Sequence, residues 1–400
     1  MKFKADVVVK NSNNVLHNEA INIKTDLAAA KELQIKDAIL YPPFINGHEH
    51  LVGNWYPRSG VNRPYKNADI WVEDMKSAPS YKERNKVWIN DGKFDLMKGN
   101  AKLLTALGIY KNIFCGCNVV QDHASRQKDE YYESFPIKVL KKYRQCHSIS
   151  MGNWWGDKEP LVEWQETKGK MPFILHLAEG TDERSSRCFP KLKEIGLLQP
   201  NTLIIHGIAL TKKDIEECAE VGTSICWCPG SNLFLIGETL NVPYALKSGV
   251  NVILGTDSTQ SGSLNLFKEM QKGYSVFPEI KAKDLYKMIT ENSRKALFLS
   301  KKYGTLSEQS EELLILKRYT DNPFQNLLKV TNDDIRLFIH KGKPIYGEEE
   351  FFPYFNLKEA DYYFFEKDKT RKFVIGHPEK VLDKINHYLG YKKDFPFLPI

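Results

Sequence analysis

The chain repeats one pattern from about residue 36 to residue 300: a short apolar run, a polar turn, then a stretch with the apolar spacing of a helix. Seven apolar runs have the length and the β-branched and aromatic content typical of buried strands, at residues 37–44, 112–120, 146–151, 171–177, 201–208, 223–229 and 250–256. Helical patterns separate most of them, at residues 131–143, 184–198, 211–222, 264–276 and 283–299.

Strands that alternate with helices pair in parallel, with the helices packed outside the sheet. Repetition at this count predicts an α/β fold of the TIM-like (β/α)8 barrel type rather than an open sheet. Seven runs leave one strand unaccounted for. Either that strand is too polar to recognise, or the barrel is distorted and incomplete between residues 155 and 171.

The two ends of the chain differ from this central region, because both contain β-type runs without intervening helices. We expect residues 1–42 and 301–355 to pair into one small β-sandwich domain, with the barrel formed by residues 43–300. Residues 356–400 form a C-terminal extension of unassigned role. Residues 54–100 are too many for a simple loop and are expected to form helices and a lid over the barrel mouth.

Composition and charge narrow the class of protein. Hydrophobic residues make up 42% of the chain and charged residues 27%, which is typical of a globular protein. The net charge of +7 arises from 57 basic and 50 acidic residues that are interleaved, so we expect no nucleic-acid partner. Neither a signal-peptide pattern nor a membrane span is recognisable, and we expect a cytoplasmic protein.

The seven cysteines, an odd number, favour reduced thiols. Two CxC pairs, Cys115 with Cys117 and Cys226 with Cys228, could be imagined to hold zinc. Alternation along a strand explains them better, because CxC lacks the usual spacing of a zinc knuckle.

Polar side chains follow the predicted strands at the points where a parallel barrel places its active site. His48 and His50 come after the first strand, and alternation directs both imidazoles to the same side. An HxH pair is weak evidence alone in a chain with ten histidines. His176, His206 and Asp257 end three further apolar runs. A buried structural histidine explains any one of these positions, but their convergence at one mouth indicates a metal site.

Four sequence motifs follow one another between about residues 38 and 300: PPFINGHEHL, HLAEG, LIIHGIALTKKDIEECAEVGTSICWCPGSN and LGTDSTQSGSLNLFKEM. In these motifs and their order the chain resembles the amidohydrolase superfamily, and within it the cytosine deaminase and chlorohydrolase-like branch. The resemblance implies one divalent metal ion, zinc or else iron, with the ligands His48, His50, His176 and Asp257. Such a donor set leaves a coordination position open for water.

The resemblance also implies roles for three catalytic residues. Asp257 would accept the proton of the attacking water, and Glu179 would pass a proton to the leaving nitrogen or to a ring nitrogen. His206 would polarise the group under attack as an oxyanion partner. The expected activity is hydrolysis of a carbon–nitrogen bond other than a peptide bond in a small molecule. Deamination of a heterocyclic amine and opening of an amide or cyclic amide both remain open.

Other residues near the strand ends are less certain candidates. His123 and Asp122 could reach the substrate or be structural, whereas His147 is expected to pack in the core. Aromatic and basic residues that could stack a planar ring or pair with an anion follow the strands: Trp55, Tyr56, Arg58, Trp154, Trp155, Arg184 and Arg187. The alternative function is a catalytically inactive scaffold or binding protein, against which the complete ligand set argues. A homo-oligomer is compatible with the sequence.

Overall fold

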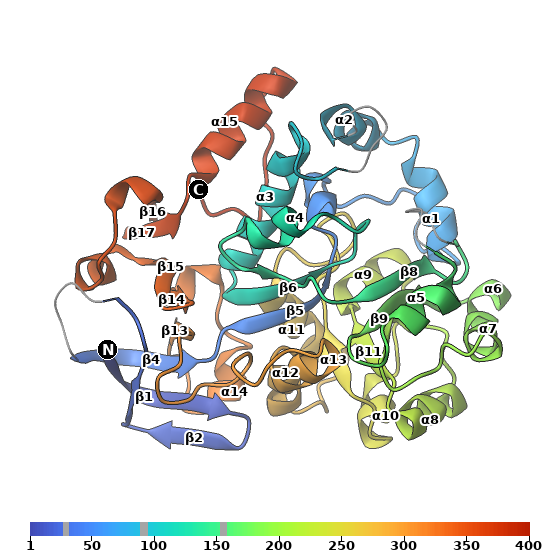
Figure 1. Ribbon diagram of the computed structural model, residues 1–400, viewed down its shortest axis with the longest axis horizontal. Coiled ribbons are helices and arrows are strands. Elements are labelled where there is room, and N and C mark those ends of the chain that lie inside the picture. The colour runs from blue at the N-terminus through green and yellow to red at the C-terminus, as the bar shows by residue number, and fades with distance from the viewer. Residues whose placement is uncertain (27–31, 89–94, 153–157) are drawn as a thin grey trace.

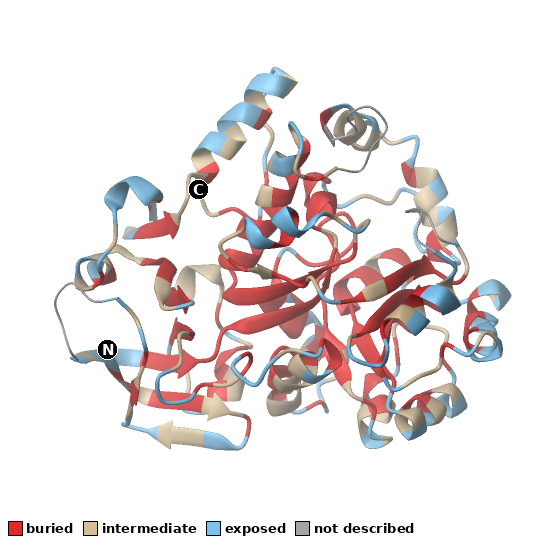
Figure 2. Ribbon diagram, in the orientation of Figure 1, coloured by how far each residue is buried: buried red, intermediate tan, exposed pale blue. Residues whose placement is uncertain are grey.

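Two parallel sheets form the centre of the computed structural model, which describes residues 1–26, 32–88, 95–152 and 158–400 (Figure 1). One sheet has the strand order β5 (Phe44–Glu49), β6 (Cys117–Asp122), β7 (Lys138–Val139). The other has the order β12 (Val252–Leu254), β11 (Ser224–Trp227), β10 (Thr202–His206), β9 (Phe173–Leu177), β8 (Arg144–Ser148). All neighbouring pairs are parallel. Most of these strands are buried along their whole length (Figure 2).

The two sheets meet where β5 lies beside β12. The Asp257 amide, just after β12, donates to the His48 carbonyl at 3.2 Å. Two glycines allow this approach. A Cβ atom on Gly47 would lie 2.6 Å from the Leu254 carbonyl oxygen, and one on Gly255 would lie 2.6 Å from the His48 Cβ. The first and last strands of the parallel region are therefore neighbours.

Within the described residues this region has eight parallel strands, so the sequence-based count of seven was wrong. The additional strand is β7, which lies inside residues 131–143, where the pattern predicted a helix. Only α4 (Asp129–Glu133) forms there, because Pro136 cannot continue a helix. A strand of two residues is too short to be recognised from its pattern. Residues 160–166, in the gap where a strand was sought, form helix α5 (Pro160–Glu166).

The predicted first strand, residues 37–44, divides between two sheets. Strand β4 (Glu32–Tyr41) belongs to the sheet of the chain ends, and the barrel-type strand β5 begins only at Phe44. Pro42 and Pro43 separate the two, since proline has no backbone N–H to donate to a sheet. His48 therefore lies within β5, and His50 follows its last residue.

Helices connect the parallel strands and cover their outer faces (Figure 1). Helix α8 (Lys212–Val221) shows how the sequence sets their limits: Thr211 and Asp214 form a capping box at its start, and Gly222, with φ +86°, ends it. The other helices of this region are α3 (Ala101–Ile113), α6 (Glu183–Ser186), α7 (Cys188–Glu194), α9 (Pro229–Leu235), α10 (Val242–Lys247), α11 (Leu266–Val276), α12 (Ala282–Met288) and α13 (Glu291–Ala296).

The two ends of the chain pair into one mixed sheet, as the sequence predicted, because β4 pairs antiparallel with β13. Its order is β16-β17-β15-β14-β13-β4-β1-β2, with β3 paired to β1. The strands are β1 (Lys2–Asn11), β2 (Asn14–His17), β3 (Ala20–Asn22), β13 (Leu313–Lys317), β14 (Ile335–His340), β15 (Lys343–Glu348), β16 (Tyr362–Lys367) and β17 (Thr370–Ile375). Helix α14 (Pro323–Asn326) follows β13, and α15 (Pro378–Leu389) contacts α3.

Helices follow β5, as expected for residues 54–100. They are the 3₁₀ turn η1 (Leu51–Trp55), α1 (Ala68–Met75) and α2 (Pro79–Trp88); residues 89–94 lie outside the described residues. Short 3₁₀ turns also occur near the C-terminus, as η2 (Asn332–Asp334), η3 (Glu349–Tyr354) and η4 (Glu359–Asp361).

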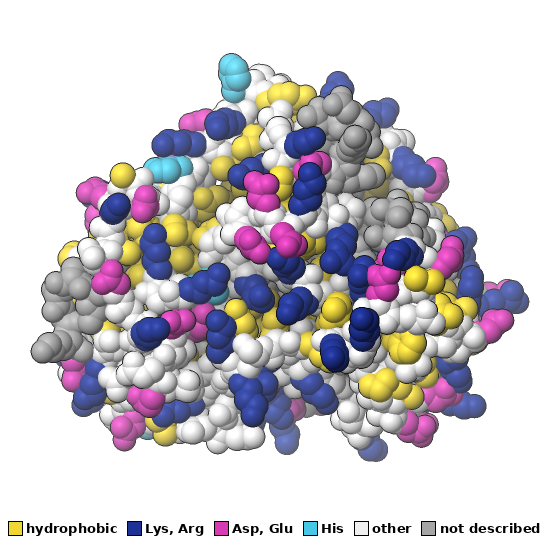
Figure 3. Space-filling view, in the orientation of Figure 1, with side chains coloured by type: hydrophobic (Ala, Val, Ile, Leu, Met, Phe, Trp, Pro, Cys, Tyr) yellow, Lys and Arg dark blue, Asp and Glu magenta, His cyan; other side chains and the backbone are white. Residues whose placement is uncertain are grey.

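On the face shown in Figure 3, basic side chains are spread out with acidic ones between them.

Candidate metal centre

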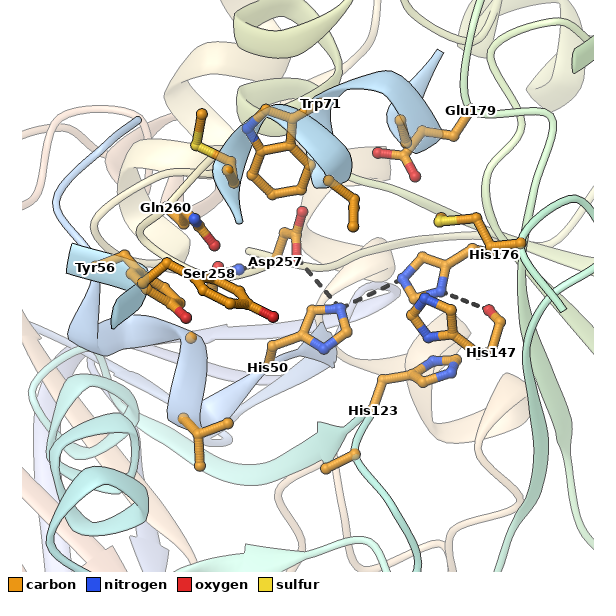
Figure 4. Close-up of a pocket in the computed structure, with 18 of the residues that line it drawn as sticks. His50, Tyr56, Trp71, His123, His147, His176, Glu179, Asp257, Ser258 and Gln260 are labelled. Carbon is orange, nitrogen blue, oxygen red and sulfur yellow. Dashed lines mark hydrogen bonds and ion pairs between the residues drawn. The ribbon is translucent and has the colours of Figure 1, made fainter. Parts of the chain in front are cut away.

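The four predicted metal ligands lie at the carboxyl ends of the parallel strands. Figure 4 shows His50, His176 and Asp257, and His48 forms potential ligand groups both with His50 and Asp257 and with His176 and His206. His50 Nε2 lies 3.3 Å from His176 Nε2 and 3.6 Å from Asp257 Oδ1. His48 Nε2 lies 3.9 Å from the same Asp257 oxygen. The His50 side chain is 23% exposed, whereas His48 is fully buried, so the cluster reaches the cavity through His50.

The donor atoms fit a divalent metal ion. Two nitrogens bound tetrahedrally at about 2.0–2.1 Å from zinc lie roughly 3.3 Å apart, which matches the separation between His50 and His176. His48 Nδ1 faces Gln121 Oε1 at 3.3 Å, and the buried His48 Nε2 has no hydrogen-bond partner among the described residues. His176 Nδ1 donates to the His147 carbonyl at 2.8 Å, leaving Nε2 as the ligand atom.

The electrostatic environment favours the ligating protonation states. Burial, followed by the neighbouring imidazoles, lowers the pKa of His48 and His176 well below the ordinary value, so both are neutral near pH 7. Burial opposes ionisation of Asp257, but His50, His48 and His206 outweigh it and lower the pKa of its carboxyl. Ser231 and Ser261 donate to Asp257 Oδ2 at 2.8 and 2.9 Å, leaving Oδ1 directed at the imidazoles.

Glu179 and His206 lie together beside the ligands, and both line the cavity. Glu179 Oε1 is 3.4 Å from His206 Nε2. Burial, together with the charges of Asp257 and Asp69, raises the pKa of Glu179 well above its ordinary value, which favours the protonated acid. His206 Nδ1 lies 2.8 Å from Asn232 Oδ1, an acceptor that fixes the tautomer with hydrogen on Nδ1.

Sequence reasoning did not single out Ser231, Asn232 or Ser261. Ser231 and Asn232 lie in the CPGSN segment at the start of α9, directly after β11. Their signal was present, since polar residues end an apolar strand there as they do at His176. They support Asp257 and His206 instead of facing the cavity.

The backbone around the centre adopts an unusual conformation at both His206 (φ +73°) and Asp257 (φ +51°). This left-handed region is unfavourable for residues other than glycine and is held only where the surroundings determine it. The asparagine and serine contacts described above fix the two side chains. The centre is therefore built by specific polar contacts as well as by the strands.

His123 and His147 also line the cavity, and His147 is buried at the same time, as its expected packing implies. With His176 they form a second group of imidazoles whose ligand atoms lie within 4.8 Å of one another. Burial lowers the pKa of His147 to about 3 and that of His123 well below its ordinary value. Because His176 Nδ1 is engaged by the His147 carbonyl, His176 has one nitrogen to offer and cannot serve both groups at once.

Asp122 proves structural. Its carboxylate accepts hydrogen bonds from the Leu51 amide at 2.9 Å and from the Tyr131 hydroxyl at 2.6 Å.

The cysteines also have no role at the centre. All seven are free and buried, and no potential ligand group among the described residues includes one, as strand alternation predicted for the CxC pairs.

The cavity in front of the centre has a volume of about 270 Å³. Helices α1 and α2 cover it, as expected of a lid, and supply Trp71, Met75, Tyr81 and Arg84. Its other wall includes Tyr56, labelled with Trp71 in Figure 4. The lid is predominantly aromatic and apolar, and its one cation is Arg84 among the described lining residues.

Of the aromatic and basic residues suggested to stack a ring or pair with an anion, Tyr56 alone lines this cavity in the part of the chain that is described. Arg58 turns away, donates to the carbonyls of Gly230 and Ser261 and packs over Phe234. Ion pairs engage the other two arginines, Arg184 with Asp69 and Arg187 with Glu183. Trp55 is buried against Phe395. Trp154 and Trp155 lie outside the described residues.

Comparison with known proteins identifies a family. Residues 134–344 match the Amidohydrolase family. A 5-methylthioadenosine/S-adenosylhomocysteine deaminase from Pyrococcus abyssi is 35% identical over 343 residues, covering 76% of this chain and 79% of the relative. The enzyme of that name from Thermococcus sibiricus is 27% identical over 340 residues, covering 74% of this chain and 77% of the relative.

Solved structures show the same fold. A zinc complex of atrazine chlorohydrolase from Arthrobacter aurescens TC1 has a TM-score of 0.67 at 14% identity, over 96% of this chain and 99% of that chain. An adenosine deaminase from Xanthomonas campestris with bound zinc has a TM-score of 0.64 at 15% identity, over 90% and 95% of the two chains.

A ring of histidines and one aspartate at the ends of parallel β/α strands defines the class of a metal-dependent hydrolase. The chain belongs to the amidohydrolase family, which confirms the resemblance of its motifs. It is a hydrolase of carbon–nitrogen bonds other than peptide bonds. No helix in the described part of the chain is long and apolar enough to cross a membrane.

Proposed function

We propose that the protein is a zinc-dependent deaminase that releases ammonia from an aminopurine nucleoside. The observation that supports this most directly is the buried carboxyl group of Glu179, which faces the cavity beside the ligand cluster, 3.4 Å from His206 Nε2. Burial raises its pKa and so favours the acid form, and removal of an amino group requires proton delivery to nitrogen. The relatives from Pyrococcus abyssi and Thermococcus sibiricus are deaminases of adenosine derivatives.

The metal site of this proposal holds one divalent ion, zinc in preference to iron, with ligands His48, His50, His176 and Asp257. The single free nitrogen of His176 supports one ion rather than two. A zinc ion bound there supplies Lewis acidity and lowers the pKa of a water molecule to near neutrality.

The side chains divide the remaining work. Asp257 Oδ1 points toward the ligand cluster and takes the proton of the attacking water, while Ser231 and Ser261 hold the other carboxylate oxygen. Glu179 donates its proton to the ring nitrogen of the substrate, and the water proton taken up by Asp257 passes to the departing amino group. The hydroxyl proton that remains on the product returns to Glu179. His206, whose Nδ1 is held by Asn232, presents Nε2 to the cavity; in its protonated form it donates from Nε2 to the oxygen that attacks the carbon and stabilises the negative charge developing there.

The fold assigned to this function is a distorted (β/α)8 barrel, residues 43–300, made of the two parallel sheets. Contact between β5 and β12 supports closure on one side. Residues 1–42 and 301–355 make the small β-sandwich domain, and residues 356–400 extend its sheet through the pairing of β17 with β15. The substrate is a small molecule, and a nucleic-acid partner is not part of the proposal.

A substrate screen tests the function. Zinc-loaded protein is incubated with adenosine, 5′-methylthioadenosine, S-adenosylhomocysteine, cytosine, an aminotriazine and N-acyl amino acids, and released ammonia is measured. We expect ammonia from the adenosine derivatives. Release from cytosine or the triazine alone would place the substrate outside the nucleosides, and ring opening or acyl cleavage without ammonia would contradict the deaminase assignment.

The lid contributes to binding through Trp71 of α1, whose indole N–H donates to the Ser59 carbonyl at 3.1 Å. Trp71→Ala is expected to raise KM by up to about tenfold with an unchanged metal content, because stacking contributes roughly 0.5–1.5 kcal/mol. Steady-state kinetics with the best substrate measures this. Val61→Ala, at a position 86% exposed, is the control and keeps the wild-type KM. An unchanged KM in Trp71→Ala would remove the lid from substrate recognition.

A further inference from the structure

A fully buried ion pair lies behind the metal ligands, outside the cavity. The pair is formed by Lys111 of α3 and Glu49 of β5. Lys111 Nζ lies 3.3 Å from Glu49 Oε1 and 3.0 Å from Glu49 Oε2. Both side chains are no more than 1% exposed. Glu49 stands between His48 and His50 in the sequence, and strand alternation turns it away from the imidazoles and toward α3.

Lys111 also reaches the segment that carries Asp257. Its Nζ lies 3.2 Å from the Asp257 carbonyl oxygen, 3.3 Å from Thr256 Oγ1 and 2.9 Å from Asn54 Oδ1. One ammonium group therefore contacts the end of β5, the turn η1 and the loop after β12. The Asp257 peptide that it contacts is the one with the left-handed backbone.

Glu49 makes the reciprocal contacts. Its carboxylate accepts from the Thr256 hydroxyl at 2.8 Å, from Asn54 Nδ2 at 3.2 Å and from the His50 amide at 3.2 Å. Asn46 adds a further bond to Thr256 Oγ1 at 2.8 Å. The two charged groups with these polar neighbours form a connected network between the strand of His50 and the loop of Asp257.

This network is absent from the cavity wall, since none of Lys111, Glu49, Asn54 and Thr256 lines it. Neither charge can therefore contact a substrate held there. A buried pair of this kind is a poor source of stability, because removal of its charges from water offsets most of its attraction. Its contacts are better explained by the geometry that they impose on neighbouring segments.

We infer that Lys111 and Glu49 are positioning residues that set the separation between the His50 imidazole and the Asp257 carboxylate, and thereby the zinc affinity of the centre. The inference rests on the metal site of the proposed function. Partners that orient metal ligands typically contribute 10–100-fold to metal affinity or activity. The pair acts through the backbones of both ligand segments.

The test uses the double variant Lys111→Met with Glu49→Gln, which removes both charges together. A single replacement would leave an uncompensated buried charge and could unfold the protein. Zinc affinity is measured by competition with a chromogenic chelator, and the zinc-induced rise in Tm is measured on the same protein. We expect zinc binding about 10–100-fold weaker than in the wild type and a smaller rise in Tm.

Glu312→Gln provides the matched control. Glu312 Oε2 lies 2.8 Å from His340 Nδ1 in another buried pair, next to strands β13 and β14. This variant is expected to lower the Tm of the metal-free protein while keeping the wild-type zinc affinity. A purely structural role for Lys111 and Glu49 would give their double variant the same behaviour.

A single variant that keeps both charges provides the test if the double variant does not fold. Thr256→Val removes the hydroxyl between Glu49 and Lys111 and keeps both charges, so we expect a smaller loss of zinc affinity in the same direction. Wild-type zinc affinity in the folded double variant, or in Thr256→Val if the double variant is unfolded, overturns the inference and leaves the proposed function intact. Absence of zinc binding by the wild-type protein overturns the proposed function itself.

Discussion

Glu179→Gln is expected to keep its zinc and to lower kcat for deamination by about 10²- to 10⁴-fold, the usual contribution of a general acid or base. Glutamine preserves the size of the side chain but has no carboxyl proton to deliver. Glu179 is not among the proposed ligands, so the metal content should not change. Metal analysis and the kinetics of ammonia release on the same preparation measure both quantities.

The pH profile gives a second readout of Glu179. Burial, Asp257 and Asp69 raise the pKa of this carboxyl, so it carries its proton well above the ordinary range and loses it only as the pH rises further. Wild-type activity should therefore decrease at high pH, as Glu179 loses its proton. The residual activity of Glu179→Gln should not show this decrease. Glu163→Gln is the control, because Glu163 is a buried glutamate paired with Arg144 away from the cavity. Full activity in Glu179→Gln would contradict the proton-transfer role.

His48→Ala is expected to lose both metal and turnover. His48 is fully buried and its Nε2 lies in the ligand cluster, so alanine removes one of the four proposed donor atoms. Loss of a ligand should weaken zinc binding by more than the roughly 100-fold that a supporting partner contributes. At a zinc concentration 1,000 times the wild-type Kd, wild type gains about 4 kcal/mol of stability from the metal, and most of this should be missing in the variant.

Thermal unfolding with and without zinc, together with metal analysis, checks this expectation. His340→Ala is the matched control, since His340 is an equally buried histidine of the terminal sheet. Its metal-free protein should be destabilised too, but its zinc-induced rise in Tm should equal that of the wild type. Stoichiometric zinc in purified His48→Ala would remove His48 from the ligand set.

The candidate site was largely predictable because its residues end strongly apolar strands. His176 and His206 come at or beside the last residue of their strands, and a parallel sheet brings such positions together. The polar side chains that support them, such as Asn232, were missed because single polar residues in a helix are common. Their importance depends on distances that only the folded chain provides.

The limits of the fold prediction also have physical causes. Strand β7 has two residues, fewer than any periodic pattern requires, and follows a proline within an apparently helical stretch. The division of residues 37–44 between two sheets depended on two prolines within one apolar run. The pairing of the chain ends could be predicted from shared β-type patterns, but the pairing order of the strands could not.

Long-range contacts explain why cationic residues were misjudged. Arg58 looked suited to a substrate anion but is satisfied by two backbone carbonyls, whereas Arg84, in a polar helix, reaches the cavity. Lys111 lay in a helix with an ordinary lysine content, and nothing local marked it as buried against Glu49. Side-chain burial of charged residues is decided by tertiary partners, which a single sequence does not specify.

Titration of zinc into metal-free protein, with ammonia release from 5′-methylthioadenosine measured at each step, tests the central claim most directly. The proposed function predicts no release without metal, a linear rise with added zinc and a plateau at one zinc ion per chain. Ammonia release that is independent of metal, a plateau at two ions, or no ammonia from any nucleoside at saturating zinc would contradict the one-zinc deaminase.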